Sequence, residues 1–108
     1  MIDQVEKCVE RIKKELSQAR IREFSNKSLN ATAEIFESDG PTVAEWYVKE
    51  KIERRDETAE MEALLRVLEL MKEYPVIQRR RPIGRLIIKT LNVLLRESQT
   101  EKQKRGVS

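Results

Sequence analysis

The sequence predicts an all-α fold, a single small helical bundle of four or five helices over residues 1–97 with a flexible basic tail over residues 98–108. Hydrophobic residues make up 39% and charged residues 38% of the 108 residues, a balance typical of one small core surrounded by solvated helix faces. Three glycines, three prolines and 5% aromatic residues supply few turns and few strand formers. The third observation is the spacing of the apolar residues, which recur every three or four positions.

The first predicted helix covers residues 2–19. Its apolar side chains alternate at steps of three and four: Ile2, Val5, Val9, Ile12, Leu16 and Ala19. This stripe is narrow, so we expect another helix to cover it, either from the same chain or from a second copy. Cys8, the one cysteine, lies beside the stripe and is expected to be a packing residue with no disulfide partner in the chain.

Two shorter helices follow, separated by Gly40 and Pro41. Serine and asparagine side chains at residues 25–28 are predicted to cap the first of them. Its apolar face contains Leu29, Ala33 and Phe36. Thr42 and Glu45 have the spacing of a capping box, which predicts the start of the next helix.

The aromatic residues are few. Trp46, Tyr47 and Tyr74 lie near apolar stripes, so we expect them in the core and not on a surface that stacks nucleic-acid bases. Residues 53–57 are all charged. The sequence leaves open whether the chain turns there or the helix continues as an exposed stretch.

The last two predicted helices are the most apolar. The first has a stripe of Met61, Leu64, Leu65, Leu68 and Met71 and is expected to stop before Pro75. After a connector over residues 75–81, Pro82 suits the first position of the final helix. That helix has a wide apolar face and is expected at the centre of the domain: Ile83, Leu86, Ile87, Leu91, Leu94 and Leu95.

Charge is distributed unevenly along the chain. Residues 1–74 contain 13 Lys/Arg and 17 Asp/Glu, a net charge of −4, whereas residues 75–108 contain 9 and 2, a net charge of +7. A basic terminal third predicts contact with something acidic, which is a nucleic acid, an acidic protein surface or the acidic half of the protein itself.

The candidate site is a cluster of cations around the start of the final helix. Its members are Arg79, Arg80, Arg81 and Arg85, extended along the helix by Lys89 and Arg96. Guanidiniums at a helix N-terminus, where backbone N–H groups also point outward, favour a bound anion. The competing interpretation is that these arginines cap the preceding helix and pair with its acids, Glu69 and Glu73. We favour binding to nucleic-acid backbone without sequence specificity, because the final helix lacks the polar side chains that read bases.

Enzymatic function is not expected, and neither is a catalytic residue, a bound metal or a cofactor. The chain contains no histidine and no glycine-rich phosphate loop. Two carboxylate pairs, Glu34 with Glu37 and Glu53 with Asp56, resemble the signature of the all-α nucleotide pyrophosphohydrolases of the MazG type. That resemblance implies four carboxylates holding Mg²⁺ over a nucleoside triphosphate. A solvated charged face is the alternative that we favour.

A second resemblance concerns residues 64–96. A leucine-rich helix ends at Tyr74-Pro75-Val76, and Ile83-Gly84 opens a basic, aliphatic helix. This arrangement resembles the N-terminal helical domain of the elongation factor TFIIS, which implies a protein-binding adaptor with a hydrophobic groove between the last two helices. We also expect a homodimer, because the stripes of the first and last helices exceed what one small domain covers. No apolar run reaches the length of a membrane span, and the first residues lack the character of a secretion signal, so a cytoplasmic or nuclear location is expected.

Overall fold

The computed structural model describes the backbone of residues 2–107 and the side chains of residues 3–100. Within these residues the chain is entirely helical, which confirms the predicted fold class. There are seven helices in the described part: α1 (Ile2–Leu16), α2 (Asn26–Asp39), α3 (Pro41–Glu53), α4 (Thr58–Lys72), α5 (Pro75–Arg79), α6 (Arg81–Lys89) and α7 (Leu91–Val107). The expectation of four or five was too low, because the connector before Pro82 forms the short helix α5 and the final helix is divided at Thr90.

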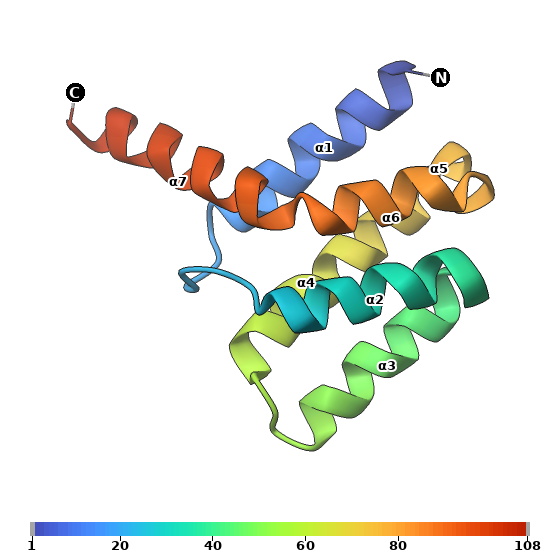
Figure 1. Cartoon of the computed structure of the whole chain (residues 1–108). Helices are drawn as coiled ribbons and strands as arrows, with labels where there is room; N and C mark the ends of the chain where they lie inside the picture. Colours follow the sequence, from blue (N-terminus) through green and yellow to red (C-terminus); the bar gives the residue numbers. More distant parts are fainter. Residues whose placement is uncertain (1, 108) are drawn as a thin grey trace.

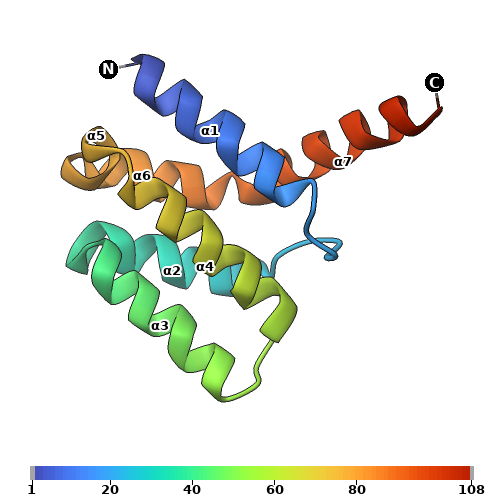
Figure 2. The same cartoon turned by 180° about the vertical axis from the view of Figure 1, so that it is seen from behind.

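The helices form a flat bundle whose principal extents are 45 × 37 × 19 Å. Helix α2 packs against α6 and α3, and α3 packs against α4 (Figure 1). Helix α1 crosses α7 and also contacts α4, so it lies at the opposite edge of the bundle from α3 (Figure 2). This order places the C-terminal end of α2 next to the N-terminal end of α6.

Part of the apolar stripe of α1 is covered from within the chain. Ile12, Leu16 and the neighbouring Cys8 have no exposed surface, and the main contacts of α1 are with α4, α5 and α7. Val5 and Val9 of the same stripe are only partly buried. Burial raises the pKa of the Cys8 thiol from 9.0 to about 11, so the thiolate form is strongly disfavoured and the expected packing role fits.

Helices α6 and α7 are two parts of one kinked helix. The Thr90 amide donates to the Leu86 carbonyl and the Leu94 amide donates to the Thr90 carbonyl, both at 3.1 Å, so Thr90 closes the last turn of α6 and opens the first turn of α7. Thr90 itself departs from helical geometry, with φ −96° and ψ 4°. A nearly common register of faces is shown by buried residues that keep the helical spacing on both sides of Thr90: Ile87, Ile88, Leu91 and Leu95.

The first residues of the predicted tail, 98–100, belong to helix α7, and the first two of them pack against the rest of the chain. Ser98 is 3% exposed, and the side-chain amide of Gln99 donates to the Ile21 carbonyl at 2.9 Å. The backbone of α7 is helical to Val107. The side chains of residues 101–108, which make up the rest of the predicted tail, lie outside the described ones.

Two expectations about α3 are also wrong. Trp46 is 63% exposed and does not belong to the core, although Tyr47 and Tyr74 are partly buried against it. Helix α3 has no side-chain cap at its start, because its N-cap residue is Gly40 and Thr42 already lies inside the first turn. Glu45 is buried, and its carboxylate pairs with the Lys72 ammonium on α4 at 3.3 Å. A tertiary ion pair has replaced the local capping box.

The open question about the charged residues 53–57 is resolved in favour of a turn. Helix α3 ends at Glu53, and the chain reverses through Arg55 and Glu57, whose φ angles are 59° and 51°. Left-handed φ values at two residues that carry side chains are uncommon and stop the helix there. On the second helix the predicted cap is confirmed, since the Ser25 hydroxyl accepts a hydrogen bond from the Ser28 amide at 3.3 Å.

Candidate functional site

Arg81 caps helix α2. Its guanidinium donates to the carbonyl oxygens of Ser38 at 3.2 Å and Glu37 at 3.5 Å. These are among the last carbonyls of the helix, where the backbone dipole is negative and a cation is favourable. The guanidinium lies close against Gly40, where a Cβ atom would come within 3.2 Å of Nη2. Arg81 therefore closes the contact between the α2–α3 turn and α6.

Arg85 and Lys89 on α6 also form ion pairs with α2, the helix that Arg81 caps. Arg85 lies 3.5 Å from the Glu34 carboxylate and 4.0 Å from that of Glu37, and Lys89 lies 3.6 Å from Glu34. The two cations, four residues apart on one face of α6, thus lie opposite the two glutamates, which are three residues apart on one face of α2. The self-pairing interpretation of the sequence holds for these cations, but the acids come from α2 and not from α4.

Of the two acids proposed as their partners, Glu73 has a different role. Glu73 accepts hydrogen bonds from Arg11 at 2.9 and 3.3 Å, and this contact lowers the pKa of the Glu73 carboxyl. The Arg11 guanidinium also lies 5.8 Å from the centre of the Tyr74 ring. The Glu73 carboxylate at the end of α4 is therefore paired with Arg11 of α1 and not with the arginines of residues 79–85.

Arg79 and Arg80 remain unpaired. Both are exposed, and within the described part of the chain neither guanidinium has a hydrogen bond or an ion pair. They lie at the junction where α5 ends and α6 begins. The short helix α5 before the junction and Pro82 after it restrict the backbone conformation of both residues. We call Arg79 and Arg80 the basic corner. Arg96 on α7 is likewise exposed, with no partner among the described residues.

The backbone at the start of α6 adds little to this site. Pro82 has no N–H group, and the Ile83 amide already donates to the Arg80 carbonyl at 2.9 Å. The first turn consequently offers fewer free donors than an ordinary helix N-terminus. Any anion at the basic corner would be held by guanidinium groups.

The four carboxylates that resemble the pyrophosphohydrolase signature do not come together. Glu34 and Glu37 lie beside α6, whereas Glu53 and Asp56 lie at the other end of α3, about 18 Å of helix away. Among the residues described, no group of three or more acidic, cysteine or histidine side chains is placed to hold a metal ion. The geometry offers no support for a magnesium-dependent reaction at these positions.

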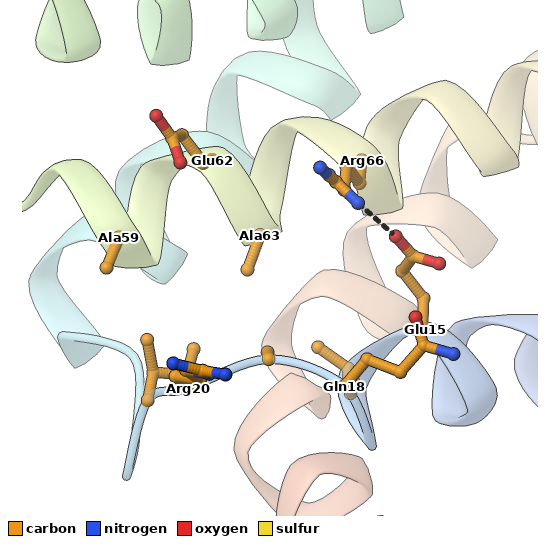
Figure 3. A pocket seen from close by; sticks show the side chains of 10 residues that line it. Glu15, Gln18, Arg20, Ala59, Glu62, Ala63 and Arg66 are labelled. Atoms are coloured by element: carbon orange, nitrogen blue, oxygen red, sulfur yellow. Dashed lines mark hydrogen bonds and ion pairs between the residues drawn. The ribbon is translucent and has the colours of Figure 1, made fainter.

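A small pocket between residues 18–21 and the start of α4 was not anticipated from the sequence (Figure 3). Ala59 and Ala63 point toward the 18–21 segment, and an ion pair of 3.1 Å between Arg66 and Glu15 crosses one end. The sequence feature that could have indicated this pocket is the pair of alanines four residues apart on one face of α4, because small side chains leave space beside a helix. The volume of about 240 Å³ lies below the range of ordinary small-molecule sites, about 300–1,000 Å³.

No protein-family model, curated protein or solved structure matches this chain. No helix in the described residues is long and apolar enough to cross a bilayer. A functional conclusion therefore depends on the side chains described above, and the unpaired arginines of the basic corner are the strongest feature among them.

Proposed function

We propose that this chain is a non-enzymatic helical protein whose basic corner binds the phosphate backbone of a nucleic acid without reading its sequence. The observation that supports this function is the pair of exposed guanidiniums, Arg79 and Arg80, with no partner among the described residues. Adjacent unpaired cations repel each other, and a bound phosphate reverses that repulsion. Arginine suits the role because its planar fork donates two parallel hydrogen bonds to phosphate oxygens.

The other cations divide into two groups. Arg96 has no partner among the side chains that the structure describes, and it extends the phosphate-binding surface along α7. Arg81, Arg85 and Lys89 hold α2 against α6 through the contacts described above, and their charges add to the positive potential around the corner. The proposal thus assigns direct phosphate contacts to Arg79, Arg80 and Arg96.

The test measures affinity for a short DNA duplex as a function of salt concentration. Each phosphate contact contributes a slope of about −0.9 to the plot of log K against log salt. Replacing both corner arginines by alanine should weaken binding and reduce the size of the slope by about 2. Thermal stability should be unchanged, because these side chains make no contact that holds the fold.

A charge-matched variant controls for the general field. Arg20→Ala/Arg22→Ala removes two exposed arginines from the α1–α2 loop and lowers the net charge from +3 to +1, as the corner variant does. We expect its salt slope to stay close to that of the unmodified protein. Equal losses in both variants, or no loss in the corner variant, would show that the corner is not the binding site.

Arg81→Ala separates the structural role from the binding role. Loss of the cap on α2 should lower the melting temperature, because two terminal carbonyls lose their donor. The salt slope of the folded variant should decrease by less than that of the corner variant. A larger decrease would place Arg81 among the direct phosphate contacts.

A further inference from the structure

An apolar ridge runs along the outer face of α6 and α7. Leu86 is 63% exposed and Val93 is 45% exposed. They lie seven residues apart, and because the buried residues Ile87, Leu91 and Leu95 keep the helical spacing through Thr90, Leu86 and Val93 share one face, about 10 Å apart along the axis. Partly buried Ile83 and Leu94 border the same face. We call Ile83, Leu86, Val93 and Leu94 the apolar ridge.

The apolar ridge continues toward α1. An ion pair of 3.3 Å between Lys13 and Glu97 fixes α1 beside α7. Val9 lies one turn before Lys13 on α1 and is partly buried, and Val93 lies one turn before Glu97 on α7. Figure 2 shows α1 crossing α7 and diverging from α6 toward its own N-terminus. The crossing leaves partly exposed apolar side chains on both helices.

A row of cations borders the other side of the ridge. On the shared helical register, Arg85, Lys89 and Arg96 fall on one side of the line between Leu86 and Val93. The carboxylates of α2 only partly neutralise this row, since the separations are 3.5 to 4.0 Å and Arg96 has no partner among described residues. Residues 75–108 carry nine Lys/Arg against two Asp/Glu, so the ridge lies in a region of positive potential.

We infer that the apolar ridge is a docking surface for an acidic amphipathic α-helix of a partner protein. Apolar residues seven apart on a partner helix repeat the 10 Å spacing of Leu86 and Val93, which favours a helix over an extended peptide. Acidic residues along one edge of that helix would face Arg85, Lys89 and Arg96.

A second copy of the chain fits the ridge less well. A two-fold symmetric contact would bring the same cationic row of both copies together, and like charges at an interface are unfavourable. The inference goes beyond the proposed nucleic-acid function. The two proposals share Arg96, but the basic corner and the apolar ridge have no residue in common, so variants of the corner and of the ridge test them separately.

The test uses a synthetic helical peptide with leucines at i, i+3 and i+7 and glutamates at most other positions. Titrated into the labelled protein, it should shift the amide NMR signals of residues 83–97 in a saturable manner. The double variant Leu86→Ser/Val93→Ser should bind this peptide at least about tenfold more weakly. A peptide with lysines in place of the glutamates should also bind at least about tenfold more weakly to the unmodified protein.

Trp46→Ser supplies the matched control, because Trp46 is as exposed as Leu86 but lies on α3. We expect it to leave peptide affinity unchanged within about twofold. The corner variant should also bind the peptide normally, and the ridge variant should bind duplex DNA normally. These two cross-checks keep the failure of one proposal distinguishable from the failure of the other.

Three results would overturn the inference. The first is the absence of binding by the glutamate peptide, or equal affinity for both peptides. The second is unchanged peptide affinity in the ridge variant. The third is self-association of the unmodified protein in sedimentation equilibrium that the ridge variant abolishes, because a second copy would then occupy the ridge.

Discussion

The contact between α2 and α6 predicts a specific sensitivity at Gly84. An added Cβ atom there would lie 2.1 Å from Cε1 and 2.6 Å from Cζ of Phe36. These separations are shorter by about 1.4 and 0.9 Å than the optimum between carbon atoms, about 3.5 Å. Phe36 has no exposed surface, so its ring has no solvent to move into. Gly84→Ala must therefore separate the two helices or distort the core.

The expected magnitude follows from two opposing effects. Overpacking of a core costs about 1–3 kcal/mol, and the depth of this overlap places the cost at the upper end. Alanine is a better helix former than glycine by about 1 kcal/mol, which offsets part of the loss. We expect Gly84→Ala to reduce the free energy of unfolding by about 2 kcal/mol and the melting temperature by roughly 10 °C.

The assay is urea unfolding followed by circular dichroism, on Gly84→Ala, Phe36→Leu and the double variant. Leucine lacks the far edge of the ring, so the cost of Gly84→Ala should fall by at least about 1 kcal/mol in the Phe36→Leu background. A Gly84→Ala protein as stable as the unmodified one would refute the reasoning. An equal cost in both backgrounds would also refute it, because the ring would then not be the obstacle.

Three further predictions concern individual side chains. The Asn92 side chain accepts a hydrogen bond from the Phe24 amide at 2.7 Å and donates one to the Phe24 carbonyl at 3.0 Å. Asn92→Ala should therefore lower the free energy of unfolding, measured in urea, by about 1–3 kcal/mol. A loss near zero would mean that water replaces both hydrogen bonds. The raised pKa of Cys8, about 11 against 9.0, means that the free energy of unfolding should fall by about 2 kcal/mol between pH 9 and pH 11, and Cys8→Ala should remove that part of the decline. Because Trp46 is exposed, Trp46→Phe should change the free energy of unfolding by less than about 0.5 kcal/mol. The tryptophan fluorescence maximum of the unmodified protein should resemble that of indole in water, and a blue-shifted maximum would place the side chain in an apolar environment.

The sequence was informative wherever the deciding interactions are local. The three- and four-residue spacing predicted the helices and much of their buried faces, including Ile12 and Leu16, which have no exposed surface. It also placed Leu86 on an apolar face at the centre of the domain, although that side chain is 63% exposed. The Ser25 cap was also predictable, because cap and helix are adjacent in the chain. The short helix α5 was missed because five residues are too few to show a period.

The partners of charged side chains were beyond the sequence. Arg81 binds carbonyls 43 and 44 residues away, and Glu45 leaves its local capping pattern to pair with Lys72, 27 residues away. Sequence neighbours were the obvious alternatives, and only the packing of α2 against α6 and of α3 against α4 decided between them.

By itself the sequence determined the helical class, the faces that become apolar and the accumulation of positive charge after residue 75, since these depend on composition and on spacing along one helix. The tertiary structure alone decided which cations stay unpaired at the basic corner and which apolar side chains remain on the ridge. Periodicity identifies a face as apolar but does not specify how much of it the neighbouring helices cover. That coverage depends on helix crossing geometry, which contacts distant in sequence establish.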